Sequence, residues 1–274
     1  MAQLPDNFQF SQSNLQDYVE CPRRFELRYI QGLRWPAAEA EPIAEHERHM
    51  RQGQVFHHMI HQHQIGIPAA ALTPMATDSD LRSWWQNYLD TDLLGTLPPN
   101  REPEVMLSAS LGTHRLLAKY DLLAIDNERA VIVDWKTSRR VPSPERLAQR
   151  LQTIVYRYLL VEAGAVFNGG VPIDPAQVEM IYWFATEPDV TVRFAYDSVT
   201  HQTAAEYLHG LATEIEARSV FDLTTDTHKC RFCTYRSLCE RGIRAGALES
   251  LDAGEDAVTE DFDFDFDQIA EVEF

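Results

Sequence analysis

One short apolar stretch that ends in charged residues, residues 130–137 (AVIVDWKT), most constrains how this chain can fold. Four consecutive apolar residues predict a strand that is buried on both faces of a sheet, and such a strand seldom carries ionisable groups. Asp134 and Lys136 are exceptions to this rule. Because side chains alternate along a strand, both charged side chains should lie on one face of the sheet, with Trp135 on the other. The sequence therefore predicts that a carboxylate and an ammonium group meet at the end of a central strand.

A second apolar stretch, residues 114–125, predicts another strand, and residues 126–128 (DNE) predict a turn that folds it antiparallel onto the first. This hairpin would bring Asp121 close to Asp134. Two carboxylates and a lysine at one sheet edge are the groups that a divalent cation and a phosphodiester require. The alternative is a surface ion pair between Asp134 and Lys136 at the end of an ordinary strand.

A helical segment completes the pattern, because Gln152 and Tyr156 are four residues apart and share one helix face. Alone, this segment would be an ordinary amphipathic helix. An aspartate ending one strand, an apolar run closing in Asp-x-Lys and a helix with Gln-x-x-x-Tyr together resemble the PD-(D/E)xK nucleases, specifically their RecB-like exonuclease branch. The resemblance implies that the catalytic residues are Asp121, Asp134, Lys136, Gln152 and Tyr156, the last two positioning the nucleotide.

The candidate metal ligands begin with His57, because the spacing Gly53-x-x-x-His57 resembles the first motif of that family. The resemblance implies that Mg²⁺ or Mn²⁺ is held by His57, Asp121, Asp134 and the backbone carbonyl of Trp135. An imidazole among carboxylates suits Mn²⁺ particularly well. Glu104 matches a position where many relatives have an acidic residue, and Glu102 lies close enough to compete with it.

A helical zinc site is a rival interpretation, since His57 and His61 are four residues apart. Such a site needs further ligands, and His58 stands where a His-Glu-x-x-His motif requires its glutamate. We therefore expect His58, His61 and His63 to be solvent-facing or to lie at the edge of the core.

The remaining periodicity predicts an α/β fold in which a mixed sheet is flanked by helices, as in the restriction-endonuclease-like core that the resemblance implies. Ser13 and Gln16 have the spacing of a capping box for a first helix, which Cys21-Pro22 should interrupt. The other expected elements are helices at 37–65, 80–94, 144–163 and 198–218, and strands at 104–112, 114–125, 130–136, 178–184 and 190–196.

Three clustered cysteines and one distant cysteine favour metal ligation over disulfides. They are Cys21, Cys230, Cys233 and Cys239. Zinc and an iron–sulfur cluster both accept four thiolates, and spacing alone does not separate them. One N-terminal cysteine followed by Cys-x-x-Cys-x5-Cys is similar to the signature of RecB-like and CRISPR-associated exonucleases, which implies a [4Fe–4S] cluster. The chain departs from the family pattern at Ala118, often glycine in relatives, and at Tyr120, which replaces the proline that names the superfamily.

The net charge of −18 is concentrated at the C-terminus, since residues 252–274 hold ten acidic and no basic residues. The preceding residues hold 32 acidic against 24 basic side chains, a net charge of −8. A mildly acidic body is compatible with DNA binding where basic patches and bound metal reverse the local field. We expect one domain over residues 1–251, followed by the tail. No apolar run is long enough for a membrane span and no signal peptide is recognisable, which predicts a cytoplasmic protein.

The acidic tail alternates Asp and Phe over residues 261–267 and ends in Phe274. An acidic low-complexity end predicts a disordered, solubilising tail. The aromatic residues indicate a protein partner, because the tail resembles the partner-binding tips of bacterial single-stranded-DNA-binding proteins. The alternative is that the tail occupies the DNA groove of its own chain as a phosphate mimic.

These observations predict a metal-dependent deoxyribonuclease, and the resemblance implies an exonuclease on single-stranded or end-containing DNA in repair or recombination. Two alternatives stay open. One is a CRISPR adaptation factor that trims DNA before insertion. The other is a cluster-bearing DNA-binding subunit with little catalysis.

Overall fold

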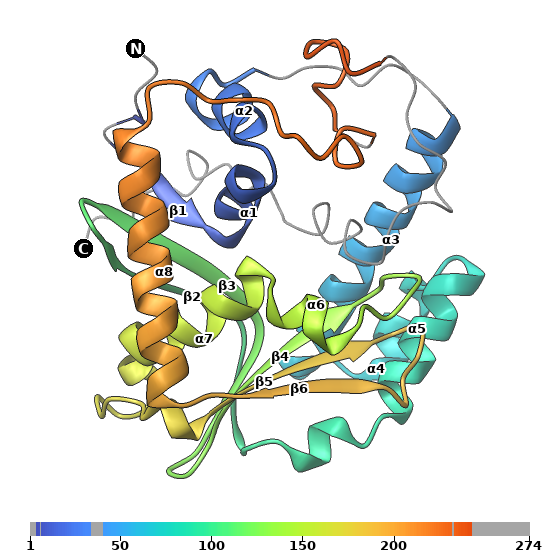
Figure 1. Cartoon of the computed structure of the whole chain (residues 1–274). Coiled ribbons are helices and arrows are strands. Elements are labelled where there is room, and N and C mark those ends of the chain that lie inside the picture. The colour runs from blue at the N-terminus through green and yellow to red at the C-terminus, as the bar shows by residue number, and fades with distance from the viewer. Residues whose placement is uncertain (1–3, 6, 34–40, 232, 243–274) are drawn as a thin grey trace.

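The computed structural model of the protein describes residues 4–5, 7–33, 41–231 and 233–242, and over residues 41–47 only the course of the backbone. Helices lie on both faces of one six-stranded sheet (Figure 1). This arrangement confirms the predicted α/β class with a central sheet flanked by helices.

The sheet is mixed, with the order β1-β3-β4-β5-β6 and with β2 also paired to β3. Pairing is parallel for β1 with β3 and for β4 with β5, and antiparallel for the other three pairs. Every residue of β4 is buried, as its apolar run predicts. The strands are β1 (Gln9–Ser11), β2 (Asn100–Leu111), β3 (His114–Ile125), β4 (Ala130–Lys136), β5 (Val178–Phe184) and β6 (Thr191–Ala195).

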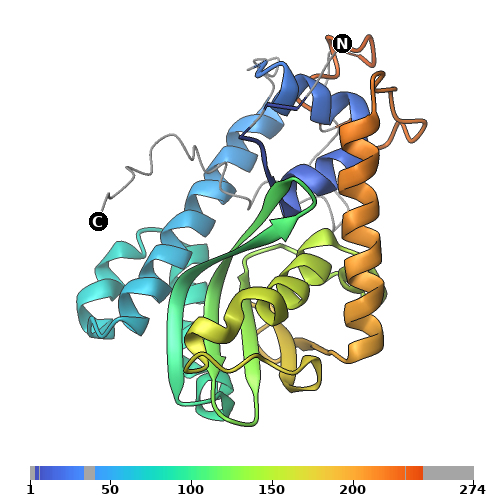
Figure 2. The ribbon, with the colours of Figure 1, turned by 90° about the vertical axis from the view of Figure 1, so that its left-hand side faces the viewer.

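The two faces of the sheet are covered by different helices (Figure 2). One face carries α3 (Glu41–Gln64), α4 (Ala69–Leu72) and α5 (Ser79–Asp90), and the other carries α7 (Leu151–Ala163) and α8 (Ser198–Ala217). Each face has its own core cluster. Trp135 packs into the cluster of α3 and α5, whereas Ile132 packs into the cluster of α7 and α8. The alternation predicted for the central strand is thereby confirmed.

The strands β3 and β4 stop pairing close to Asp121 and Asp134, and we call this point the fork. The pairing of these strands ends at Leu122 opposite Val133, although β4 continues beside β5 as far as Lys136. The next residue along β3 is Asp121, and its carboxylate Oδ2 accepts the backbone N–H of Trp135 at 2.9 Å. A side chain thus satisfies a backbone donor that lies beyond the paired part of the ladder. Asp121 and Asp134 therefore lie side by side just beyond the last paired residues of β3 and β4.

The N-terminal helix begins differently from the expectation. Residues 9–11 form β1, and Ser11 caps α1 (Gln12–Glu20) in a capping box with Asn14. The predicted cap at Ser13 is wrong, because pairing with β3 extends the chain up to Ser11 and the helix starts directly after it. The interruption at Cys21-Pro22 is confirmed: α2 (Pro22–Phe25) follows, and then a π-helical turn, η1 (Glu26–Ile30).

Two further helices are shorter than their patterns predict. The expected helix at 144–163 is divided into α6 (Pro144–Ala148) and α7, because Arg150 has an extended backbone with ψ of 140°. The helix α5 ends at Asp90, and a separate 3₁₀ turn, η3 (Leu93–Thr96), follows it. Other single turns are η2 (Thr73–Met75), η4 (Gly164–Phe167) and η5 (Pro175–Gln177).

Residues 252–274 lie outside the described residues, so the expectations for the acidic tail stay predictions, as does the single domain over residues 1–251. None of the described helices is both long and apolar enough to cross a membrane.

Candidate active site

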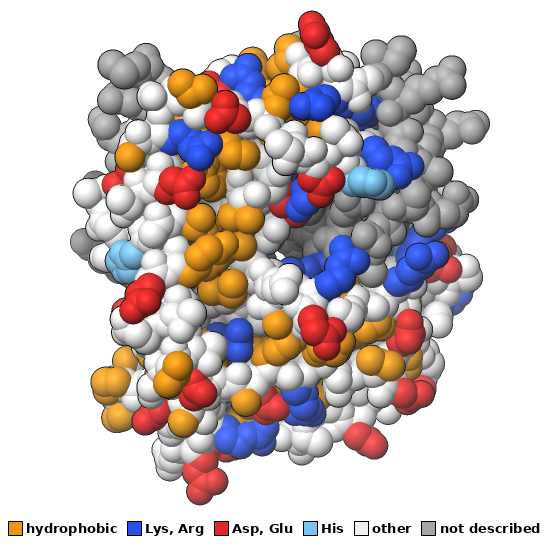
Figure 3. Space-filling view, in the orientation of Figure 1, with side chains coloured by type: hydrophobic (Ala, Val, Ile, Leu, Met, Phe, Trp, Pro, Cys, Tyr) orange, Lys and Arg blue, Asp and Glu red, His pale blue; other side chains and the backbone are white. Residues whose placement is uncertain are grey.

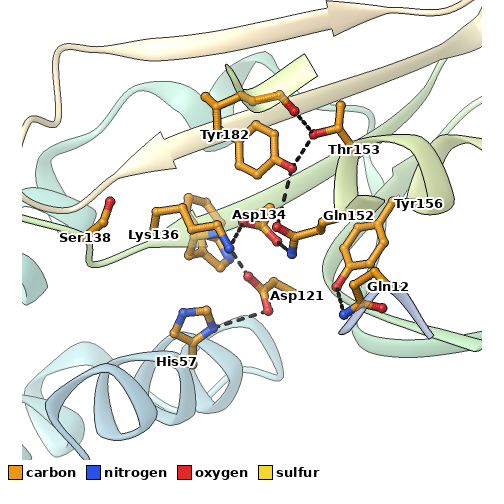
Figure 4. Close-up of polar contacts among 12 residues, drawn as sticks. Gln12, His57, Asp121, Asp134, Lys136, Ser138, Gln152, Thr153, Tyr156 and Tyr182 are labelled. Carbon is orange, nitrogen blue, oxygen red and sulfur yellow. Dashed lines mark hydrogen bonds and ion pairs between the residues drawn. The ribbon is translucent and has the colours of Figure 1, made fainter. Parts of the chain in front are cut away.

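The centre of the site is Asp134, whose two carboxylate oxygens are contacted from different elements (Figure 4). Lys136 Nζ lies 3.0 Å from Oδ2, and Gln152 Nε2 on α7 donates to Oδ1 at 2.7 Å. Asp134 and Lys136 are only 2% and 5% exposed. The alternative of a surface ion pair is therefore wrong. Buried charges carry a large desolvation cost, so this pair indicates a site rather than an incidental strand end.

A second pair joins Asp121 to α3, where His57 Nδ1 lies 3.2 Å from Asp121 Oδ1. Burial raises the pKa of Asp121. The charge of His57 and its hydrogen bond, the charge of Lys136 and the N–H of Trp135 outweigh burial, so the pKa is lowered overall. These neighbours therefore favour the ionised form of Asp121. The side chains of His57 and Asp121 remain 13% and 20% exposed, which leaves them accessible to a hydrated ion.

Gly53 brings α3 close enough for this contact. A Cβ atom at Gly53 would lie 3.1 Å from Thr137 Oγ1, the residue directly after β4. The helix packs against the strand end at the one position where it lacks a side chain. His57 follows one turn later and therefore stands over Asp121.

Gln152 is held in turn by the hydroxyl group of Tyr182, which is itself contacted by Thr153. Tyr182 donates to Gln152 Oε1 at 3.4 Å, and Thr153 Oγ1 lies 2.7 Å from the Tyr182 hydroxyl. Tyr182 lies opposite Asp134 in the ladder of β4 and β5, with its ring centroid 5.8 Å from Lys136 Nζ. Burial raises the pKa of Tyr182, so the hydroxyl stays protonated and able to donate. Neither Tyr182 nor Thr153 has a sequence signal: the register of β4 with β5 brings Tyr182 to the site, and Thr153 reaches it from α7.

Tyr156 lies one turn beyond Gln152 but faces another neighbour. Its hydroxyl accepts a hydrogen bond from Gln12 Nε2 of α1 at 3.4 Å (Figure 4). Its carbonyl accepts from the Tyr120 hydroxyl at 2.9 Å, and the two rings are 4.8 Å apart. Tyr156 is 4% exposed and stands beside the residue that precedes Asp121. The Gln-x-x-x-Tyr segment thus contacts both strands of the fork.

Glu104 lies next to Asp121 across β2 and β3, since its neighbours pair with Leu122 and Tyr120. Its backbone has φ of 57°, an uncommon conformation for glutamate, and its carboxylate forms an ion pair with Lys119. Glu102 pairs in the ladder with Leu123, two residues beyond Asp121.

The other histidines of α3 agree with the expectation for solvent-facing or core-edge residues. His58 is exposed, and His61 and His63 are half-buried, with His63 Nδ1 3.0 Å from the Tyr88 hydroxyl. Within the described part of the chain, no three His, Cys, Asp or Glu side chains are arranged as a metal site. The predicted ligand sets for both the active-site ion and the cysteine site therefore remain predictions.

The four cysteines all carry free thiols. Burial raises the pKa of Cys230, Cys233 and Cys239, that of Cys233 to about 11, and the nearby Cys21 raises all three further. Segments far apart in the chain therefore bring these thiols into one neighbourhood. Two contacts hold the C-terminal segment there: Lys229 Nζ lies 3.3 Å from Glu20 Oε1, and the Tyr235 hydroxyl donates to the Leu33 carbonyl at 2.6 Å.

Comparison with known proteins assigns a family to this chain. A family model described as PD-(D/E)XK nuclease superfamily matches residues 9–240. Nucleases of this superfamily hydrolyse phosphodiesters and generally use Mg²⁺ or Mn²⁺.

Two solved structures resemble the chain. One is described as a "Putative exonuclease" from Eubacterium rectale, with 11% identity, a TM-score of 0.48, and 81% of this chain and 87% of that chain covered. The other, SSO0001, has 15% identity, a TM-score of 0.40, and 84% and 85% covered. No curated protein matches the chain.

Proposed function

We propose that this chain, which belongs to the PD-(D/E)XK nuclease superfamily, is a metal-dependent deoxyribonuclease of the RecB-like exonuclease branch. We propose that it degrades single-stranded or end-containing DNA during repair or recombination. The observation that carries the proposal is the buried contact of Lys136 and Gln152 with the two oxygens of Asp134, beside the paired Asp121 and His57.

The residues at the fork fit a divalent cation. Asp121 and Asp134 supply hard oxygen ligands. The imidazole of His57 adds a nitrogen ligand, which suits Mn²⁺. We propose that these three side chains, with the carbonyl of Trp135, hold the ion. When bound, the ion would polarise the scissile phosphate and lower the pKa of the attacking water.

The remaining side chains prepare the site for a phosphodiester. Lys136 is held at Asp134, so its positive charge is placed where negative charge grows on the phosphate as water attacks and the P–O bond breaks. Gln152 donates to Asp134, which keeps that carboxylate oriented. In this proposal Tyr156, next to Gln12, orients the nucleotide.

The charge near the site supports a nucleic-acid substrate despite the acidic composition. From Lys136 to Arg150 the sequence holds five basic residues and one acidic residue. This segment begins at the ion pair with Asp134 and ends two residues before Gln152. Lys and Arg side chains gather beside the hollow above α6 (Figure 3). These positive charges attract a phosphate backbone, and DNA binding should weaken as the salt concentration rises.

A cleavage assay with three DNA forms tests the activity. With Mg²⁺ or Mn²⁺, linear single strands and linear duplexes should be degraded, whereas closed circular DNA should survive because it has no end. Chelation by EDTA should stop cleavage, and an excess of the metal should restore it. Equal rates on circular and linear DNA would exclude the exonuclease, and no cleavage of any form with either metal would contradict the nuclease itself.

We propose further that Cys21, Cys230, Cys233 and Cys239 hold a [4Fe–4S] cluster. Four free thiols from both ends of the described chain suit the four thiolate ligands that such a cluster takes. Reduced thiols are also the usual state in the cytoplasm, where we place the protein.

For the acidic tail we propose recruitment of a protein partner through its Phe residues. Deleting residues 252–274 should leave cleavage by the purified enzyme unchanged and abolish capture of the partner in a pull-down. Faster cleavage and tighter DNA binding by the truncated chain, most marked at low salt, would instead identify the tail as an autoinhibitor. A deletion that changes neither cleavage nor bound proteins would leave only the solubilising role.

A further inference from the structure

The helix α7, which carries Gln152, begins in an unusual way. Its N-cap residue is Arg150, whose side chain makes no capping hydrogen bond. The first helical N–H, that of Leu151, is instead donated to Gln16 Oε1 of α1 at 3.2 Å. The first N–H groups of a helix lack partners within the helix, so this bond from another element takes the place of a cap.

The amide of Gln16 is oriented for this task. Its Nε2 donates to Glu20 Oε1 at 3.0 Å, which leaves Oε1 turned toward Leu151. Glu20 is itself held by Lys229 at 3.3 Å and by an ion pair with Arg24. Several groups therefore determine which way the Gln16 oxygen points.

The same helix reaches α7 a second time. Gln12 lies four residues before Gln16, on the same face of α1, and donates to the Tyr156 hydroxyl at 3.4 Å. The helix α1 is itself well anchored: Leu15 is fully buried, and the Tyr18 hydroxyl donates to Glu214 of α8 at 2.6 Å. Two glutamines of one fixed helix therefore contact α7 on either side of Gln152, at Leu151 and at Tyr156.

We propose that Gln16, assisted by Gln12, is a positioning residue of the nuclease site. Gln152 directly follows Leu151, and its 2.7 Å bond to Asp134 depends on where the first turn of α7 lies. Gln16 fixes that turn, and through it the amide that orients Asp134. This inference rests on the role proposed above for Gln152.

The test compares two substitutions of Gln16 in the full chain. Gln16→Met removes the acceptor for Leu151 at similar size, and we expect single-turnover DNA cleavage to slow by roughly tenfold with little change in DNA affinity. Gln16→Glu keeps an acceptor at the start of α7, where a carboxylate is favourable. It loses the bond to Glu20 and places two carboxylates one turn apart, so its melting temperature should fall while cleavage stays within about twofold of the original.

A matched control is Gln202→Met on α8, because Gln202 is exposed and also donates to a glutamate four residues later, at 2.9 Å. Its cleavage rate should be unchanged. In a Gln152→Ala background, Gln16→Met should have no further effect, since the two residues act through one bond.

The outcomes separate this inference from the proposed function. If Gln152→Ala slows cleavage but Gln16→Met does not, the inference is overturned and the nuclease assignment stands. If cleavage by both Gln16 variants falls only in parallel with their melting temperatures, Gln16 is structural and not a positioning residue. If Gln152→Ala has no effect, the role of Gln152 in the proposed function fails, and the role of Gln16 fails with it.

Discussion

Replacing Lys136 with alanine is expected to reduce DNA cleavage by about 100- to 1,000-fold or more, the loss typical of removing one group that stabilises transition-state charge. Lys136 Nζ lies 3.0 Å from Asp134, and no other lysine lies on β4. Single-turnover cleavage of linear DNA at saturating Mg²⁺ or Mn²⁺ measures the effect. DNA binding, measured in Ca²⁺ by fluorescence anisotropy, should change little.

The burial of Lys136 changes the design of this experiment. Lys136 is 5% exposed, and removing one partner of a buried ion pair costs about 3–5 kcal/mol of stability. Asp134 is 2% exposed, and in the variant it would lose the ammonium group 3.0 Å away. The double variant Lys136→Met, Asp134→Asn removes both charges and keeps an acceptor for Gln152. We expect it to be inactive and more stable than Lys136→Ala.

A matched control for charge loss is Arg193→Gln, because Arg193 forms an ion pair with Glu179 at 3.0 Å on β5 and β6. Its cleavage rate should match that of the unmodified chain. Folded Lys136→Ala protein that cleaves DNA at the original rate would remove Lys136 from the active site.

Protein purified without oxygen should be brown and contain about four irons and four sulfides per chain. Cys233→Ser should remove the colour and lower the melting temperature, because the cluster would join Cys21 to a segment more than 200 residues later. By the loop-closure entropy used for disulfides, a cluster that cross-links these two segments would destabilise the unfolded state by on the order of 5 kcal/mol.

Loss of the cluster should also slow DNA cleavage. Cys21 is the C-cap of α1, and α1 contacts α7 through Gln12 and Gln16. A loosened α1 would release the first turn of α7 and with it Gln152. Leu238→Ala, next to Cys239 and 38% exposed, is the control and should keep its iron. One zinc per chain without sulfide would replace the cluster with a structural zinc site, and cysteine variants that keep full iron would exclude these ligands.

The sequence by itself determined the elements whose pattern is local. The apolar run before Asp134 predicts a buried strand, and alternation alone separates Lys136 from Trp135, because covalent geometry imposes the period of two. The hairpin that returns Asp121 toward Asp134 follows from the short turn at residues 126–129. The break at Pro22 likewise follows from the missing N–H and the fixed φ of proline.

Only the tertiary structure decided how these elements meet. The fork between β3 and β4 depends on where their pairing stops, and Tyr182 reaches the site only through the register of β4 with β5. The wrong cap at Ser13 has the same origin, since the three-residue strand β1 forms by pairing with β3 some 100 residues later. Gln16 likewise contacts Leu151 across 135 positions. Such contacts depend on the packing of whole elements, and no local period or propensity encodes which distant residues will be neighbours.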